Sequence, residues 1–170
     1  MTRYSAILDS PIGALGICTE ADRLIGVDFL GERGLCAPDD AFSVRVTEQI
    51  DQYFRDPGFV FTLPFDERGT AFQKRVWQAL RGIPRAEPVS YGELARQLGT
   101  AARAIGGACR ANPMPLLTPC HRVVAAHGLG GFSGDAAGGW VAAKEWLLAH
   151  ERNETPTTTV RLSRVRSDQM

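Results

Sequence analysis

The sequence lacks a long apolar segment. None of its apolar runs approaches the roughly 18 residues that a membrane-spanning helix needs. The first residues, MTRYSAILDSPIG, also lack the apolar core and the small-residue cleavage site of a secretory signal peptide. We therefore expect a cytoplasmic protein without a membrane segment.

Paired cysteine motifs are absent as well. The chain has four cysteines with no CxxC pair among them, namely Cys18, Cys36, Cys109 and Cys120. Its three histidines all lie in the last third of the chain, namely His121, His127 and His150. Without a secretory signal this pattern gives no reason to expect disulfides, and it offers no local Cys/His cluster for a metal. We therefore predict no metal site.

The chain has no net charge, because 19 lysines and arginines balance 19 acidic residues. The balance conceals a difference between the two halves. Residues 1–66 carry five arginines and eleven acidic residues, whereas residues 67–152 carry eleven basic and six acidic residues. Such an asymmetry suggests that the second half meets a polyanion, and chance segregation of solvated charges explains it equally well.

Residues 1–66 have the pattern of a small α+β unit. Short strand-like runs, separated by turn residues, are predicted at residues 4–8, 14–18 and 24–29. Apolar residues then recur at helical spacing, which predicts a helix over residues 41–55. Residues 59–65 resemble a further strand. No reactive pattern occurs here, so we expect a supporting domain.

The pattern turns helical after this unit. Three helices are predicted to begin after the capping residues Thr70, Ser90 and Thr100. Glu93 completes a capping box with Ser90. The second helix ends at Gly99 and the third spans residues 101–111, an arrangement typical of a helix-turn-helix. Many proteins use the same hairpin only for packing, so this motif alone leaves contact with DNA open.

The start of the third helix is poor in side chains that could read bases. It begins Ala101-Ala102-Arg103, and alanine and glycine dominate the next turn. Such a surface can approach a groove closely but offers few donors or acceptors to the base edges. If it binds DNA, we expect contacts to phosphates and to shape, with little sequence preference. The alternative is that the small residues let this helix pack tightly on its neighbour.

Together these patterns predict an α+β protein with two domains. A small N-terminal domain of β-meander and helix, residues 1–66, is expected to pack on a mainly helical C-terminal domain, residues 67–152, that carries a (winged) helix-turn-helix. A last helix is predicted over residues 140–150. Residues 153–170 are rich in Thr, Ser and Arg and have little apolar content, which predicts a disordered tail.

The tetrapeptide Pro119-Cys120-His121-Arg122 is the most informative motif. Proline restrains the backbone before the cysteine, and basic residues follow at once. Sulfur attacks as the thiolate, which neighbouring cationic or hydrogen-bonding groups favour. Side chains of adjacent residues in an extended chain point to opposite sides, so contact between Cys120 and His121 could require a bridging water. An isolated Cys-His pair is more often structural than catalytic, so the wider context decides.

That context resembles the O6-alkylguanine-DNA alkyltransferase family. The resemblance is strong over about residues 69–151 and weak before them. It rests on Asn112-Pro113 followed by Pro119-Cys120-His121-Arg122-Val123, together with three groups of motifs in the same order: Phe72-Gln73 with Val76-Trp77, then Ser90-Tyr91-Gly92-Glu93-Leu94-Ala95 with Arg103-Ala104-Ile105-Gly106, and Lys144-Glu145-Trp146-Leu147-Leu148-Ala149-His150-Glu151.

The resemblance implies a reaction and its participants. Cys120 would attack the alkyl carbon on guanine O6, His121 would take the thiol proton through a water, and Glu151 would orient that histidine. Asn112 would brace the active-site loop. The alkyl group would remain on the sulfur as a thioether, so each molecule would act once and no cofactor would be needed. O4-alkylthymine would be a further substrate.

The resemblance also implies residues that hold the damaged base. Tyr91 would place its hydroxyl near the purine ring and help to neutralise the departing guanine. Backbone groups of Val123, Cys120 and Ser133 would hold the edge of the base. Pro115 and Phe132 would form walls of the pocket.

Double-stranded DNA is the implied partner, bound through the minor groove by the helix-turn-helix. A sulfur atom cannot reach a base that is still stacked, so the damaged nucleotide must rotate out, and Arg103 would fill the space that it leaves. Further contacts to DNA are expected from Thr100, Ala101, Ala102 and Arg110. We expect a monomer in solution, located at the nucleoid if the source is prokaryotic; cooperative binding along DNA is left open.

The chain departs from the family pattern in two places. Phe132 stands where the family often has tyrosine, so a hydroxyl contact is missing, and the segment 133–139 is longer than in many members. Two alternatives belong to other functional classes. One is a non-catalytic protein that recognises alkylated DNA, although such relatives commonly carry tryptophan in place of the reactive cysteine. The other is a cysteine hydrolase that uses Cys120, His121 and Glu151, for which no oxyanion hole is indicated.

Overall fold

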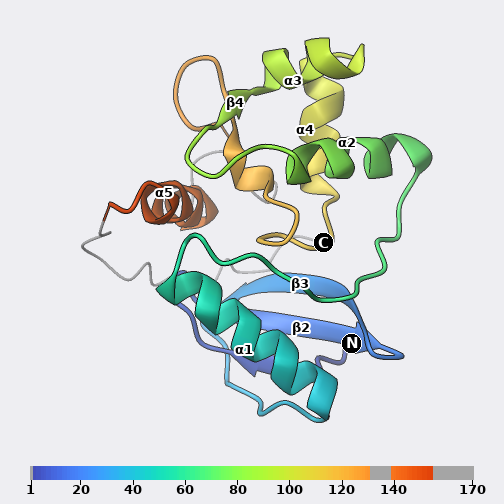
Figure 1. Ribbon diagram of the computed structural model, residues 1–170, viewed down its shortest axis with the longest axis vertical. Helices are drawn as coiled ribbons and strands as arrows, with labels where there is room; N and C mark the ends of the chain where they lie inside the picture. Colours follow the sequence, from blue (N-terminus) through green and yellow to red (C-terminus); the bar gives the residue numbers. More distant parts are fainter. Residues whose placement is uncertain (1, 131–138, 155–170) are drawn as a thin grey trace, which may run out of the picture.

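A computed structural model describes residues 2–130 and 139–154. A three-stranded sheet with helix α1 on one side forms one half of the molecule, and helices α2, α3 and α4 form the other (Figure 1). Helix α5 lies between the two halves. The mixture of a small antiparallel sheet and helices confirms the predicted α+β class. The predicted tail falls at residues 153–170, of which 155–170 lie outside the described residues.

The sheet is an antiparallel meander in the order β1 (Ala6–Leu8), β2 (Ala14–Glu20), β3 (Arg23–Gly31). This confirms the three predicted strands, although β2 and β3 are each longer than expected. Ala21 and Asp22 connect β2 to β3 with φ values of 48° and 56°. Two consecutive left-handed residues make a tight hairpin turn whose twist matches that of the paired strands.

Helix α1 (Ala41–Arg55) covers one face of the sheet, as the periodicity predicted. Asp40 begins it by accepting a hydrogen bond from the backbone N–H of Ser43 (2.6 Å). Its buried side chains, which include Val46, Ile50 and Tyr53, belong to the same apolar core as the inward-facing residues of β2. Burial of this apolar face, more than helix propensity, holds a helix of this length in place.

The prediction of a strand over residues 59–65 is wrong. This segment makes only an isolated bridge, between Phe65 and Leu24 of β3. Pro64 has no N–H to donate to a neighbouring strand, which limits its pairing. The aromatic residues of the segment pack on each other and on α1 instead, with the rings of Phe61 and Tyr53 5.6 Å apart. The apolar pattern thus reflected packing against a helix and not a continuous ladder.

The second half contains the predicted hairpin of helices. Helix α2 (Ala71–Arg81) packs against α4 (Ala102–Arg110), and α3 (Tyr91–Leu98) joins α4 through a tight turn. Gly99 ends α3 in the left-handed conformation, at φ 65°. The fully buried Trp77 donates from its indole N–H to the carbonyl of Ala108 (2.8 Å), which fixes α2 against α4.

The capping role predicted for Thr100 is wrong. Helix α4 begins one residue later than expected, with Ala101 as the N-cap, and no side chain caps it. The backbone N–H of Thr100 instead donates to Ala95 at the end of α3 (2.9 Å), so the connection is too short for its hydroxyl to serve the next helix. Thr70 and Ser90 cap α2 and α3 as predicted, each within a capping box.

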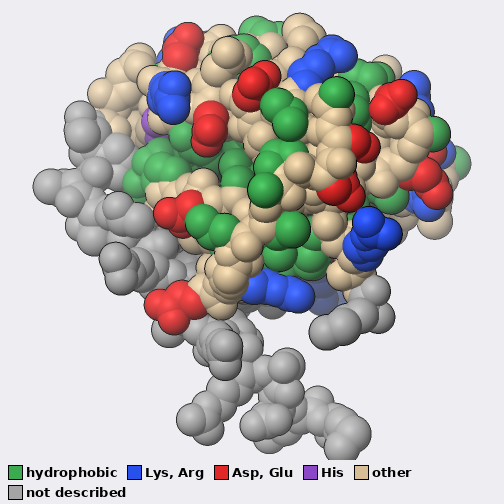
Figure 2. Space-filling model, turned by 90° about the horizontal axis from the view of Figure 1, so that it is seen from below, with side chains coloured by type: hydrophobic (Ala, Val, Ile, Leu, Met, Phe, Trp, Pro, Cys, Tyr) green, Lys and Arg blue, Asp and Glu red, His purple; other side chains and the backbone are tan. Residues whose placement is uncertain are grey.

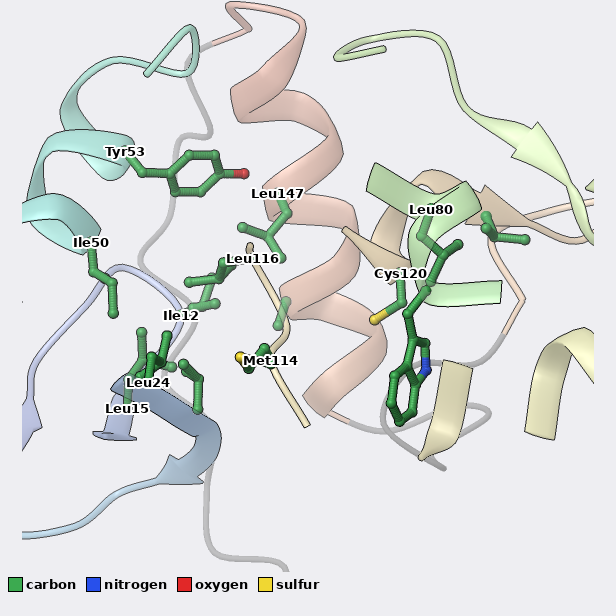
Figure 3. Close-up of a cluster of buried hydrophobic side chains, with 14 of the residues drawn as sticks. Ile12, Leu15, Leu24, Ile50, Tyr53, Leu80, Met114, Leu116, Cys120 and Leu147 are labelled. Atoms are coloured by element: carbon green, nitrogen blue, oxygen red, sulfur yellow. The ribbon is translucent and has the colours of Figure 1, made fainter. Parts of the chain in front are cut away.

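The remaining elements are a turn of 3-10 helix, a short parallel sheet and the last helix. A single turn of 3-10 helix (Cys120–Arg122) leads into β5 (Val123–Val124), which pairs in parallel with β4 (Val89–Ser90). Helix α5 spans Gly139–Glu151, one residue longer at each end than predicted. Its Leu147 joins a core that runs without a break from the sheet to the helices (Figure 3). Within the described residues, no helix is long and apolar enough to cross a membrane.

The different caps of α3 and α4 lead to a prediction. Replacing Ser90 by Ala removes a hydroxyl that accepts from the N–H of Glu93 (3.1 Å) and should cost about 1 kcal/mol of unfolding free energy. Thr100→Ala is the matched control, because the structure gives that hydroxyl no hydrogen bond, and it should change stability by less than about 0.5 kcal/mol. Urea denaturation of both variants makes the comparison. Equal losses in the two variants would show that Thr100 caps α4 after all.

Candidate active site

The loop before Cys120 is held from both sides. The amide of Asn112 donates to the carbonyl of Thr118 (2.8 Å) and accepts from the N–H of Met114 (3.0 Å), which ties the two ends of the loop together. The N–H of Val27 in β3 donates to the carbonyl of Pro113 (2.9 Å). Leu116 takes a left-handed φ of 77°, a conformation that a leucine keeps only where its surroundings enforce it. The loop is therefore a rigid mount for the cysteine.

The thiol of Cys120 is almost buried, with 6% of the residue exposed. Burial raises the pKa of this thiol, while a hydrogen bond from Asn112 and the charge of Lys144 act in the opposite direction. The net effect keeps the resting thiol protonated. Cys120 therefore becomes a strong nucleophile only if a base removes its proton.

His121, which follows Cys120 in the chain, forms a buried pair with Glu151 of α5. The ring Nε2 of His121 lies 2.7 Å from Glu151 Oε1, and both side chains are almost completely inaccessible. Arg122 binds the same carboxylate with two groups, Nε to Oε2 and Nη2 to Oε1, each at 2.9 Å. Burial alone would raise the pKa of Glu151, but hydrogen bonds and charges from His121 and Arg122 hold it well below its ordinary value. Glu151 is therefore an anion.

The state of the His121 ring follows from this geometry. A carboxylate can only accept, so Nε2 must carry the proton and Nδ1 carries the lone pair. Burial lowers the pKa of His121, although Glu151 opposes the shift, so the ring is neutral at pH 7. Among the described residues Nδ1 has no hydrogen-bond partner. The ring nitrogen that can accept a proton is thus the one left available.

The structure adds Lys144, for which no role was predicted. Its side chain is fully buried on α5, and its ammonium donates to the carbonyl of Val123 (2.7 Å) and lies over the ring of Tyr91, 5.6 Å from the centroid. Burial lowers the pKa of this lysine to about 8. The spacing of residues in the sequence could have indicated this burial. Residues 144, 147 and 151 share one face of a helix, so the charged Lys144 and Glu151 fall in the same apolar stripe as Leu147.

The structure also adds Tyr53, which comes from α1 in the other half. Its hydroxyl donates to Glu151 Oε1 (2.9 Å), across 98 positions of sequence. The sequence placed Tyr53 only in an apolar stripe. Nothing local to residues 41–55 indicates that its hydroxyl meets a carboxylate.

The expected base-binding residues are placed only in part. Tyr91 is half-buried, and burial raises its pKa to about 12, so its hydroxyl keeps its proton at neutral pH. Pro115 is buried, and both backbone groups of Val123 already make internal hydrogen bonds, its N–H to Cys120 and its carbonyl from Lys144. A carbonyl oxygen has a second lone pair for another donor. Phe132 and Ser133 lie outside the described residues.

The residues expected to touch DNA gather on the surface of the helix hairpin. Ala101, Ala102 and Arg103 are exposed at the start of α4, and Thr100 is half-exposed beside them. Arg110 is exposed about 10 Å further along α4, since it lies seven residues after Arg103. The opposite side of the molecule, seen from below in Figure 2, mixes acidic, basic and apolar side chains without one dominant sign. Among residues 2–130 and 139–154, no group of His, Cys, Asp and Glu could hold a metal ion.

Comparisons with known proteins identify the family to which the chain belongs. The family model described as 6-O-methylguanine DNA methyltransferase, DNA binding domain, matches residues 71–153, and the model described as its ribonuclease-like domain matches residues 3–66. The methylated-DNA–protein-cysteine methyltransferase of Mycobacterium tuberculosis is 38% identical over 164 residues, which cover 92% of this chain and 96% of its own. The protein of the same name from Methanosarcina acetivorans is 36% identical over 156 residues, covering 87% and 97%.

Solved structures give the same result. The crystal structure of the Mycobacterium tuberculosis O6-methylguanine methyltransferase has a TM-score of 0.75 and 35% identity, covering 89% of this chain and 93% of that chain. A crystal structure of the protein from the same organism in complex with DNA has a TM-score of 0.73 and 38% identity, covering 89% and 94%. These relatives favour alkyl transfer over both alternatives, lesion recognition without chemistry and cysteine hydrolysis.

The buried charge of Glu151 predicts a stability that depends on pH. Because its pKa is lowered by folding, its contribution is fully present above its ordinary value of 4.5 and is lost as the pH falls through the folded value. Glu151→Gln leaves Arg122 without its counterion and should cost about 3 kcal/mol at pH 7. Urea denaturation from pH 7 down to pH 3 should show the difference from the unsubstituted protein shrinking below about pH 4.5. A difference that stays constant over this range would mean that Glu151 is not an anion in the folded protein.

Proposed function

Because the chain belongs to the 6-O-methylguanine DNA methyltransferase family, we propose that it acts once per molecule, with Cys120 as the permanent acceptor of the alkyl group. It repairs DNA by alkyl transfer and has the activity of a methylated-DNA–protein-cysteine methyltransferase. The observation that carries the proposal is that Cys120, His121 and Glu151 are all buried in complementary protonation states. The thiol of Cys120 is protonated, the imidazole of His121 is neutral, and Glu151 is an anion that binds His121.

The chemistry follows from the protonation states. The thiol proton of Cys120 passes through a water to Nδ1 of His121, and Glu151 stabilises the imidazolium that forms. The sulfur attacks the alkyl carbon, the S–C bond forms, and the bond between that carbon and guanine O6 breaks. The electron pair of the broken bond stays on the guanine. The positive charge of Lys144 favours the thiolate during this step.

The departing guanine then needs a proton. Tyr91 keeps its hydroxyl proton at neutral pH, because its pKa is about 12, and can donate it as negative charge develops on the base. The proton that His121 took from Cys120 then restores the Tyr91 hydroxyl, so no extra charge is left on the protein. The product on the protein is a thioether. A thioether carbon is a poor target for a second nucleophile, and the reaction consumes the thiol of Cys120. The protein is therefore a stoichiometric reagent, for O6-alkylguanine and also for O4-alkylthymine.

Access to the buried sulfur requires the base to leave the duplex. With only 6% of Cys120 exposed, a stacked base cannot reach the thiol. Arg103 is exposed in the first turn of α4, and in this proposal it enters the duplex where the nucleotide rotates out. The small residues beside it allow a close approach to the minor groove with little sequence preference. In this proposal a monomer binds double-stranded DNA.

The acceptor is tested by mass spectrometry of the intact protein after incubation with duplex DNA that contains O6-methylguanine. The unsubstituted protein should gain one methyl mass, mapped to the peptide that contains Cys120, and should gain no more with excess DNA. Cys120→Ala should still bind the duplex but gain nothing. Cys36→Ser is the matched control, because Cys36 is the exposed cysteine, and it should react at the normal rate. Methyl transfer to Cys120→Ala would disprove the assignment of the acceptor.

The role of Arg103 gives a separate prediction. Arg103→Ala should slow transfer from duplex DNA by about tenfold or more, since nothing then offsets the few kcal/mol needed to extrude the base. Transfer from the free base O6-methylguanine, which needs no extrusion, should proceed at the normal rate. Arg110→Ala, two helical turns away, should weaken binding at low salt and leave the rate at saturating DNA unchanged. Equal slowing of Arg103→Ala with the duplex and with the free base would contradict the extrusion role.

A further inference from the structure

The last turn of α5 is attached to α1 by two hydrogen bonds that involve one residue. The hydroxyl of Tyr53 donates to Glu151 Oε1 (2.9 Å), and Nε2 of His150 donates to the backbone carbonyl of Tyr53 (2.7 Å). The ring of Tyr53 also meets the ring of His150 edge to face, with centroids 5.4 Å apart. Figure 3 shows Tyr53 reaching from α1 toward α5 with its hydroxyl leading. Side chain and backbone of this tyrosine therefore fix two consecutive residues of α5.

The hydroxyl of Tyr53 binds the oxygen that also binds His121. Oε1 of Glu151 receives three hydrogen bonds, from Tyr53 (2.9 Å), from His121 (2.7 Å) and from Arg122 Nη2 (2.9 Å). Burial and the neighbouring carboxylate raise the pKa of Tyr53 well above its ordinary value, so its hydroxyl is always the donor. Donors that share one oxygen also share its negative charge. Each bond therefore weakens the hold of that oxygen on the others.

The charges around the pair come from several elements. His121 is influenced by Glu151 and Lys144 from α5 and by Arg122 from its own turn. Glu151 is bound by Tyr53 from α1, and its backbone carbonyl accepts from Arg85 (3.3 Å). Of the described donors to the carboxylate itself, Tyr53, His121 and Arg122, the Tyr53 hydroxyl is the one from the N-terminal half, and it is neutral. It can adjust the charge on Oε1 without adding a charge of its own.

We propose that Tyr53 is a positioning residue for alkyl transfer, through which the N-terminal half fixes the carboxylate of Glu151 and limits the proton affinity of His121. The inference rests on the proposed function, in which His121 takes the proton of Cys120. A histidine that is too basic is already protonated at neutral pH and cannot act. Burial keeps His121 neutral, and the Tyr53 hydroxyl supports this state by drawing part of the negative charge of Glu151 to itself. The N-terminal half then belongs to the proton relay as well as to the scaffold.

Tyr53→Phe tests the proposal, because it removes one hydroxyl and keeps the ring. Transfer falls on the acid side as His121 becomes protonated, and the loss of the hydroxyl strengthens the hold of Glu151 on that proton. The acid limb of the pH–rate profile should therefore move to higher pH by about half a unit to one unit. Below the midpoint the rate should fall by about three- to tenfold, since the rate follows the neutral fraction of His121. At high pH the rate should change little.

Tyr4→Phe is the matched control. It also removes a tyrosine hydroxyl that donates to a carboxylate in the N-terminal half, that of Asp28 (2.8 Å), but far from the relay in the fold. Its profile should match that of the unsubstituted protein. A second measurement keeps the hydroxyl and the fold. Tyr4→Phe protein made with 3-fluorotyrosine, whose hydroxyl is a stronger donor, should show the acid limb at lower pH. The same labelling of the Tyr4→Phe/Tyr53→Phe protein, which fluorinates Tyr91 alone, should not move the acid limb.

The outcomes separate the inference from the function on which it rests. If Tyr53→Phe scales the whole profile down equally or leaves it in place, Tyr53 is structural only and the proposal is wrong. A fluorotyrosine protein with an unmoved acid limb would have the same consequence. If the unsubstituted protein transfers no alkyl group to Cys120 at any pH, the proposed function itself fails.

Discussion

The arrangement of the site depends on one buried carboxylate. The side chain of Glu151 is completely buried, and an isolated anion in such a place would be very costly. It is stabilised by donors from two different parts of the chain, Tyr53 of α1 and the pair His121 and Arg122 in the turn at Cys120. Because the anion requires all these donors, it fixes the tautomer of His121 and the position of α5 at the same time.

Burial has opposite effects on the pKa values of the nucleophile and of its base. It raises the pKa of the Cys120 thiol, so the protein does not keep a reactive thiolate that would be open to oxidation or adventitious alkylation. The same burial lowers the pKa of His121, which makes the neighbouring base available at neutral pH. The same buried environment thus keeps the thiol of Cys120 unreactive in the resting protein and keeps His121 ready to accept its proton. The thiol becomes reactive when the alkylated guanine enters the site.

The two halves share one core, and the N-terminal half makes direct contacts with residues of the site. Val27 holds the loop before Cys120, and the apolar residues of α1, the loop and α5 form a continuous cluster. A domain that merely packed beside the site would not need polar contacts to its charged residues. The sequence suggested support only, because residues 1–66 contain no reactive pattern of their own.

The sequence by itself determined the local features. Caps at Thr70 and Ser90, the periodicity of α1 and α2, the meander and the motif around Cys120 all depend on neighbours within a few positions, and the family resemblance followed from those motifs. Only the tertiary structure decided that Thr100 caps nothing, that residues 59–65 pack on α1 without forming a strand, and that Lys144 and Tyr53 meet the site. These outcomes depend on which side chains are excluded from water together. Contacts such as Tyr53 with Glu151, 98 positions apart, arise from packing that no local pattern records.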